Sequence, residues 1–177
     1  MAALLLGYDV NTARASELDE MKKLLISQKK VLRAYSSDDV NNMNGGGAWI
    51  HHMWSGDFMY LREGLVEDKA NYNFESPREG APINSDAYAI PTNAKHPGTA
   101  MVFIDYLLRP ENAVKNINYL YYPLPVRDAV ATFSDLAKEV PACDVRVEDL
   151  ENPHVFRLLS ANEVQRRTAT WTEVKAS

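Results

Sequence analysis

The sequence predicts an α/β protein in which a central, mostly parallel sheet is flanked by helices. Short apolar runs alternate with segments whose apolar residues recur at helical spacing, and Gly or Pro separates many of them. Such alternation is typical of units in which a helix connects two parallel strands. Hydrophobic residues make up 46% of the 177 residues, which is an ordinary share for a folded domain.

The elements before residue 70 alternate in this way. Ser16 to Asp19 has the spacing of a capping box, and apolar residues at helical spacing follow over 18–25. The apolar runs 31–35 and 48–53 predict strands, the second of them buried. A helix is expected over 55–64, capped by its first residue, a serine, and ended by a glycine.

Two more strands are expected in the middle of the chain, at 71–74 and 87–90, on either side of a Pro77–Gly80 turn. A helix follows over 97–108. A second helix begins at Pro110, because proline is well tolerated in the first turn.

The last helix is expected over 163–175, after a capping box formed by Ser160 and Glu163. The apolar start, Met1 to Leu6, lacks the basic residues and cleavage site of a signal peptide, so we expect a truncated chain. No apolar run reaches the roughly 18 residues that a membrane span needs.

The composition restricts the classes of partner. The formal net charge is −5, which disfavours a nucleic-acid partner and suits a small cation. The only cysteine, Cys143, excludes an intrachain disulfide and is expected to be a small, inert side chain. No motif for a cofactor, a phosphate loop or a catalytic nucleophile is present, which argues against an enzyme.

Trp54 is the most informative single residue. It stands where a predicted strand ends and a helix begins, and open α/β sheets bind ligands at the carboxyl ends of their strands. An indole at this place can hold an ammonium group or an alkyl chain. The alternative is a tryptophan that packs in the core.

Asp86 and Tyr122 also lie at element boundaries. A carboxylate at a cleft mouth can bind an amine, although an aspartate beside a turn more commonly bonds to the backbone. Tyr122 precedes Pro123 in an aromatic cluster. Such clusters are usually core, but a tyrosine in a proline-bounded loop can line a cleft.

His51 and His52 are the obvious candidates for a metal site. Adjacent residues of a strand face opposite sides of the sheet, so the two rings are not expected to share one ion. A metal-dependent hydrolase that uses them with nearby acids is the rival hypothesis from a different functional class; we expect no metal.

Four segments in a fixed order carry a family resemblance. They are 53–56 (MWSG), 85–95 (SDAYAIPTNAK), 103–113 (FIDYLLRPENA) and 122–126 (YPLPV). In this order they closely resemble the C-terminal half of periplasmic spermidine/putrescine-binding proteins. The resemblance implies a type II periplasmic-binding-protein-like lobe, truncated here. The parent protein would be periplasmic, or extracellular and membrane-anchored, and would deliver a polyamine to the membrane subunits of an ABC transporter.

The resemblance also implies roles for individual residues. Trp54 would pack along the aliphatic chain of the ligand, Asp86 would anchor an amino group, and Tyr122 would line the cleft. Asn84 stands where the family commonly has a second tryptophan, which leaves another small solute as an alternative ligand.

The resemblance divides the chain between two lobes. Residues 1–85 and 131–177 would belong to the C-terminal lobe, and residues 86–130 would return to the N-terminal lobe. The helices at 97–108 and 110–119 would then lack their usual cover. Exposed apolar faces favour association, so we expect this chain alone to self-associate and to bind polyamines weakly.

Overall fold

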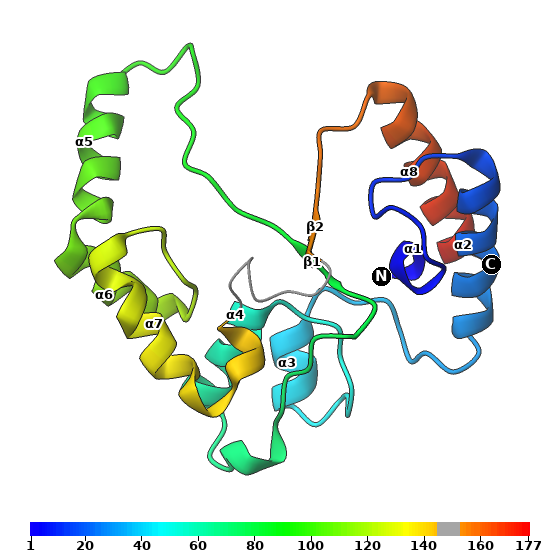
Figure 1. The fold of residues 1–177 in the computed structure, drawn as a ribbon, viewed down its shortest axis with the longest axis horizontal. Coiled ribbons are helices and arrows are strands. Elements are labelled where there is room, and N and C mark those ends of the chain that lie inside the picture. The colour runs from blue at the N-terminus through cyan, green and yellow to red at the C-terminus, as the bar shows by residue number, and fades with distance from the viewer. Residues whose placement is uncertain (145–152) are drawn as a thin grey trace. The chain divides into compact units, whose positions relative to one another are not determined.

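The computed structural model of the protein describes residues 1–144 and 153–177 and is rich in helices (Figure 1). The described residues form two compact units. Unit 1 contains Met1–Ser36, Ser76–Ser85 and residues 153–177. Unit 2 contains Ser37–Glu75 and residues 86–144. Each unit therefore joins segments that are far apart in the sequence.

Unit 1 is built around two helices that pack side by side, α2 (Ala15–Gln28) and α8 (Ala161–Ala176) (Figure 1). The short helix α1 (Ala2–Leu5) packs against α2. Lys29 lies at the C-terminal end of α8, where its Nζ donates to the carbonyl oxygens of Val174 at 3.1 Å and Lys175 at 3.2 Å. A cation at this end complements the helix dipole, so Lys29 helps to fix α8 on α2.

The sheet of the described residues has two strands, both in unit 1. β1 (Ala81–Ile83) pairs in parallel with β2 (Pro153–Val155), with Ala81 opposite Pro153 and Ile83 opposite Val155. The structure thus bears out a parallel pairing but not a central sheet. The predicted strands at 31–35, 48–53, 71–74 and 87–90 are wrong, because none of these segments is a strand.

The segment 48–53 shows why this prediction failed. Trp49 and Ile50 are 96% and 93% exposed, so the apolar run is not buried. A strand needs a neighbouring strand for its backbone groups, and a run of apolar residues does not reveal whether one is available.

Unit 2 is a helical assembly with its own core. It contains α3 (Asp39–Asn44), α4 (Ser55–Tyr60), the π-helical turn η1 (Leu61–Leu65), α5 (Pro97–Leu108), α6 (Pro110–Leu120) and α7 (Val130–Leu136). Unit 2 also contains four 3₁₀ turns: η2 (Lys69–Asn71) and η3 (Arg127–Ala129) lie between helices, and η4 (Ala137–Glu139) and η5 (Pro141–Cys143) follow α7. Phe58 and Met59 of α4 pack with Ile117 of α6 and Phe133 of α7 in the core. This core fixes the position of α4 in unit 2.

The two helices whose apolar faces were expected to be exposed, α5 and α6, differ in burial. α5 has no buried residue, and its exposed apolar side chains are Met101, Val102, Phe103, Tyr106 and Leu108. The expectation was wrong for α6, whose Ala113 and Ile117 are fully buried in the core of unit 2. The apolar side chains of α5 are therefore available for association.

The helix starts were predicted with mixed success. Proline stands at the first position of α5 and α6, as expected. The serine caps expected at Ser16 and Ser55 are wrong, because Arg14 and Trp54 hold the cap positions without a side-chain hydrogen bond. Ser16 lies two residues and Ser55 one residue inside the helix from its cap position, so neither side chain caps the free N–H groups.

The capping box of α8 is confirmed. Ser160 Oγ accepts from the Glu163 backbone N–H, and Glu163 Oε2 accepts from the Ser160 backbone N–H at 2.7 Å. The Arg157 guanidinium, followed by the Ser160 N–H, lowers the pKa of Glu163 to about 2. Because that pKa is depressed in the folded protein, the stabilisation is present at neutral pH and is lost as the pH falls toward about 2.

We expect Ser160→Ala to lower the free energy of unfolding by about 0.5–2 kcal/mol, because it removes the acceptor that caps the Glu163 N–H. Ser27→Ala is a matched control, since the Ser27 hydroxyl only donates to the Leu24 carbonyl within α2. Urea unfolding followed by circular dichroism measures both variants. Equal losses in the two variants would contradict a specific role for the cap.

Cys143 is buried, and this burial raises the pKa of its thiol to about 12. The thiol therefore stays protonated at neutral pH, which fits the small side chain expected from the sequence. In the part of the chain that the structure describes, no helix combines the length and the hydropathy needed to cross a membrane.

Candidate functional site

The N-terminus of α4 carries the candidate site in unit 2. Trp54 is the cap residue, in an extended conformation, and the residue is 51% exposed. Asp57 follows in the first turn, where the helix dipole favours an acid. An exposed indole and a carboxylate are thus held within one helical turn of each other.

Tyr122 reaches this helix end from the chain that follows α6. Tyr121, directly before it, ends α6 in the left-handed conformation, with φ of 59°. The ring of Tyr122 lies against Gly56, where an added Cβ would be 2.3 Å from two of its carbon atoms. Only glycine leaves room for this contact, so the position of Tyr122 depends on Gly56.

The Tyr122 hydroxyl donates a hydrogen bond to Asp57 Oδ1 at 2.7 Å. Burial raises the pKa of Asp57, and the bond from Tyr122 partly offsets this by favouring the carboxylate. Burial and the bond to Asp57 raise the pKa of Tyr122, so its hydroxyl remains a donor. The bond therefore fixes the orientation of the Asp57 carboxyl group.

Asp39 of α3 supplies a second carboxyl group. It is 9% exposed, one of its oxygens accepts from the Val40 N–H at 2.8 Å, and its proximity contributes to the raised pKa of Asp57. We call Trp54, Asp57, Tyr122 and Asp39 the α4 site. An aromatic face beside two acids is an arrangement that suits an organic cation.

The sequence-predicted site residues are only partly brought together. Trp54 and Tyr122 both lie at the N-terminus of α4, as a shared site requires. Asp86 and Asn84 are exposed, in the segment that follows β1. Asn84 belongs to unit 1 and Asp86 to unit 2. The groove expected between Trp54 and Asp86 stays a prediction.

Sequence reasoning missed Asp57 and Asp39 as site residues. Neither aspartate was assigned a role in ligand binding in the sequence analysis. The spacing of three residues between Trp54 and Asp57, across a helix start, is the signal that could have identified Asp57. Asp39 lies on a different helix, so only the tertiary structure shows that it is near Asp57.

The two histidines do not lie on a strand, so the argument that they face opposite sides of a sheet was wrong. His51 Nδ1 lies 2.8 Å from the carbonyl oxygen of His52. Burial lowers the pKa of His52, and the nearby Asp39 carboxylate offsets this decrease only in part. Within residues 1–144 and 153–177, no three His, Cys, Asp or Glu side chains are grouped as metal ligands.

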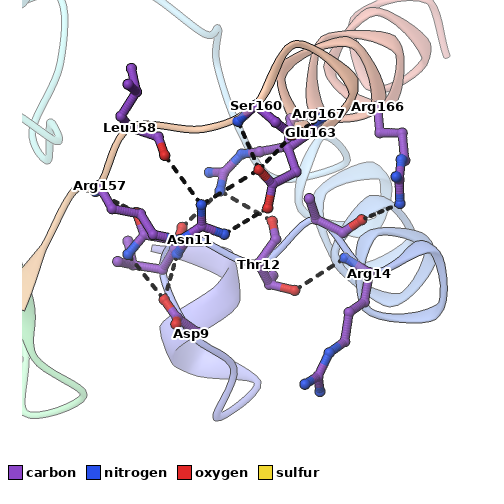
Figure 2. A network of polar contacts seen from close by, with 12 residues as sticks. Asp9, Asn11, Thr12, Arg14, Arg157, Leu158, Ser160, Glu163, Arg166 and Arg167 are labelled. Atoms are coloured by element: carbon purple, nitrogen blue, oxygen red, sulfur yellow. Dashed lines mark hydrogen bonds and ion pairs between the residues drawn. The ribbon is translucent and has the colours of Figure 1, made fainter.

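Unit 1 contains a second polar feature, a pocket of about 430 Å³ between the loop before α2 and the start of α8. Figure 2 shows the network around it. The Asn11 side chain donates to the Val155 carbonyl at 3.0 Å and accepts from the Arg157 N–H at 2.9 Å. Arg14 pairs with Glu17 and Arg157 with Glu163, so these lining charges already have partners. We interpret the network as a structural contact that holds together segments that are distant in the sequence.

The sequence matches the family model described as "Bacterial extracellular solute-binding protein" over residues 1–144. The chain is 28% identical to a putrescine-binding periplasmic protein of Escherichia coli strain K12, over 97% of this chain and 47% of the relative. It is 26% identical to spermidine/putrescine-binding periplasmic protein 1 of Haemophilus influenzae, over 87% and 42%. A spermidine/putrescine-binding periplasmic protein of Salmonella typhimurium is 31% identical, over 71% and 35%. The chain spans about half the length, or less, of these curated relatives.

Proposed function

The chain belongs to the bacterial extracellular solute-binding protein family, and on that premise we propose that it is the C-terminal half of a polyamine carrier. The parent protein would bind putrescine or spermidine between two lobes and deliver it to the membrane subunits of an ABC transporter. It would work in the periplasm, or outside the cell with a membrane anchor. The names of the relatives, which cover up to 97% of this chain, support this assignment.

The observation that carries the proposal is the pairing of Trp54 with Asp57 at one helix end. A polyamine is an alkyl chain with an ammonium group at each end, so it needs an apolar face beside a carboxylate. The half-exposed indole offers that face, and Asp57 offers an oxygen that the Tyr122 hydroxyl holds in place. We propose that Asp86 binds an ammonium group in the cleft between the two lobes of the parent protein and that Asn84 lines this cleft.

Family membership implies a periplasmic-binding-protein-like fold. We propose that the rest of the parent protein completes a type II lobe with a central, mostly parallel sheet. In the parent protein, residues 1–85 and 131–177 would form the C-terminal lobe, and residues 86–130 would return to the N-terminal lobe. The exposed apolar side chains of α5 support this, since the missing lobe would cover them.

Calorimetry on the full-length parent protein tests the ligand class. We expect putrescine and spermidine to bind far more tightly than a neutral sugar, because a cation forms charge-assisted hydrogen bonds with the carboxylates that a neutral hydroxyl group cannot form. Asp86→Ala is expected to weaken binding about 10–100-fold, as the loss of one charge-assisted bond implies. Tight binding of a neutral solute would overturn the polyamine assignment and favour the alternative, another small solute, that Asn84 suggests.

A further inference from the structure

An apolar groove of about 470 Å³ lies in unit 1 between α1 and α2, which pack against each other (Figure 1). We call it the α1–α2 groove. Most of its lining side chains are apolar: Met1, Ala2 and Leu5 from the start of the chain, and Leu24, Leu25 and Val31 from the C-terminal end of α2 and the residues after it. Leu5 and Val31 are 59% and 89% exposed, so this chain leaves the groove open to solvent.

The direction of α1 indicates what fits this groove. The helix has only four residues, Ala2–Leu5, and Met1 holds its cap position without a side-chain hydrogen bond. Side chains three and four residues apart are neighbours on a helix, so Met1, Ala2 and Leu5 share one face, and that face lines the groove. A further helical turn before residue 1 would place its side chains over the same groove.

The amino group of Met1 is consistent with a chain that continues. Burial, followed by the charge of Arg167, lowers the pKa of this amino group, so a charged terminus is poorly accommodated here. A helical N–H group bonds to the carbonyl four residues earlier, so the helical acceptors for the N–H groups of residues 2–4 would precede residue 1. A preceding turn would replace the charged amine with a neutral amide and would supply those acceptors.

We propose that α1 is the last turn of a longer helix in the parent protein and that apolar side chains of the preceding turn fill the α1–α2 groove. This inference rests on the proposed function, which makes this chain one half of a longer carrier. The length of the relatives supports it, because the chain covers only 47% of the putrescine-binding periplasmic protein of Escherichia coli. The apolar lining specifies the occupant: the parent residues three and four positions before Met1, on the groove face, are apolar and not charged.

Amide hydrogen exchange compares this chain with the full-length parent protein. In this chain the amides of residues 2–4 have no preceding turn to bond to and should exchange rapidly. In the parent protein they should exchange at least about 100-fold more slowly, because a continuous helix holds them in hydrogen bonds. The amides of residues 20–24, in the middle of α2, are the reference and should be protected in both proteins. Rapid exchange of residues 2–4 in the parent protein would overturn the proposal.

Leu5→Gln tests the groove itself, because glutamine keeps a high helix propensity and removes the apolar contact. We expect it to lower the thermal unfolding midpoint of the parent protein by several degrees and to leave that of this chain nearly unchanged, since Leu5 is exposed here. Leu158→Gln is the control: Leu158 is 96% exposed in unit 1 and does not line the groove, so both midpoints should stay unchanged. Equal shifts of the two proteins by Leu5→Gln, or of the parent protein by the two variants, would contradict the proposal.

Putrescine binding by the same parent protein separates this proposal from the proposed function. Protected amides at residues 2–4 without putrescine binding would support the longer helix and overturn the polyamine carrier. Rapid exchange at residues 2–4 together with tight putrescine binding would overturn the longer helix and support the carrier.

Discussion

Gly56→Ala is expected to lower the free energy of unfolding by about 1–3 kcal/mol, because the new methyl group enters space that the Tyr122 ring occupies. A loss of stability is unusual for this substitution, since a change from glycine to alanine within a helix ordinarily stabilises the protein by about 0.5–1 kcal/mol. A Cβ at Gly56 would be 2.3 Å from the ring, so Tyr122 must move. That movement would also break its bond to Asp57 and weaken polyamine binding.

Gly64→Ala is the matched control for this change. It lies in η1, in the same unit, and its added Cβ would meet Tyr121 and Tyr60 at 3.7 Å, an ordinary contact distance. We expect Gly64→Ala to leave the unfolding midpoint nearly unchanged or to raise it. Thermal and urea unfolding compare the two variants. A Gly56→Ala protein as stable as the wild type would show that Tyr122 does not pack against this glycine.

Asp57→Asn should weaken putrescine binding about 10–100-fold at neutral pH, because it removes the charge of a charge-assisted hydrogen bond while keeping the shape of the side chain. The Tyr122 hydroxyl can still donate to the amide oxygen, so the geometry of the helix end is preserved. The loss should therefore appear in the dissociation constant and not in the unfolding midpoint.

Asp135→Asn controls for the overall charge. Asp135 lies on α7 of the same unit and forms a surface ion pair with Lys138 at 2.6 Å. We expect its replacement to change putrescine affinity less than about twofold, since exposed ion pairs contribute little and the site is untouched. If both asparagine variants weakened binding equally, the effect would reflect net charge and not a contact with Asp57.

The helices could be predicted because their signals are local. Proline in the first turn marked α5 and α6, and the Ser160–Glu163 capping box marked α8. Strands have no such local signal. β1 pairs with β2 across about 70 residues, and each contains a proline, Pro82 in one and Pro153 in the other. Sequence reasoning therefore placed strands at apolar runs and missed the real pair.

The candidate site was likewise predictable only where its signals are local. Trp54 was identified from its position at a helix start, which depends on neighbouring residues alone. The bond between Tyr122 and Asp57 joins residues 65 positions apart, and it depends on the left-handed turn at Tyr121. Asp39 is the least predictable member, because nothing in its local sequence distinguishes it from a loop aspartate.

The central claim is that a cation lies against Trp54 while Asp57 holds its charge. The most direct test is the indole N–H resonance of Trp54 in the full-length protein, assigned with Trp54→Phe and followed as putrescine is added. Trp49 and Trp171 serve as internal references within this chain. We predict a large shift for Trp54 that Asp57→Asn moves to much higher putrescine concentrations. Saturation with putrescine while the Trp54 resonance stays unchanged would contradict the account.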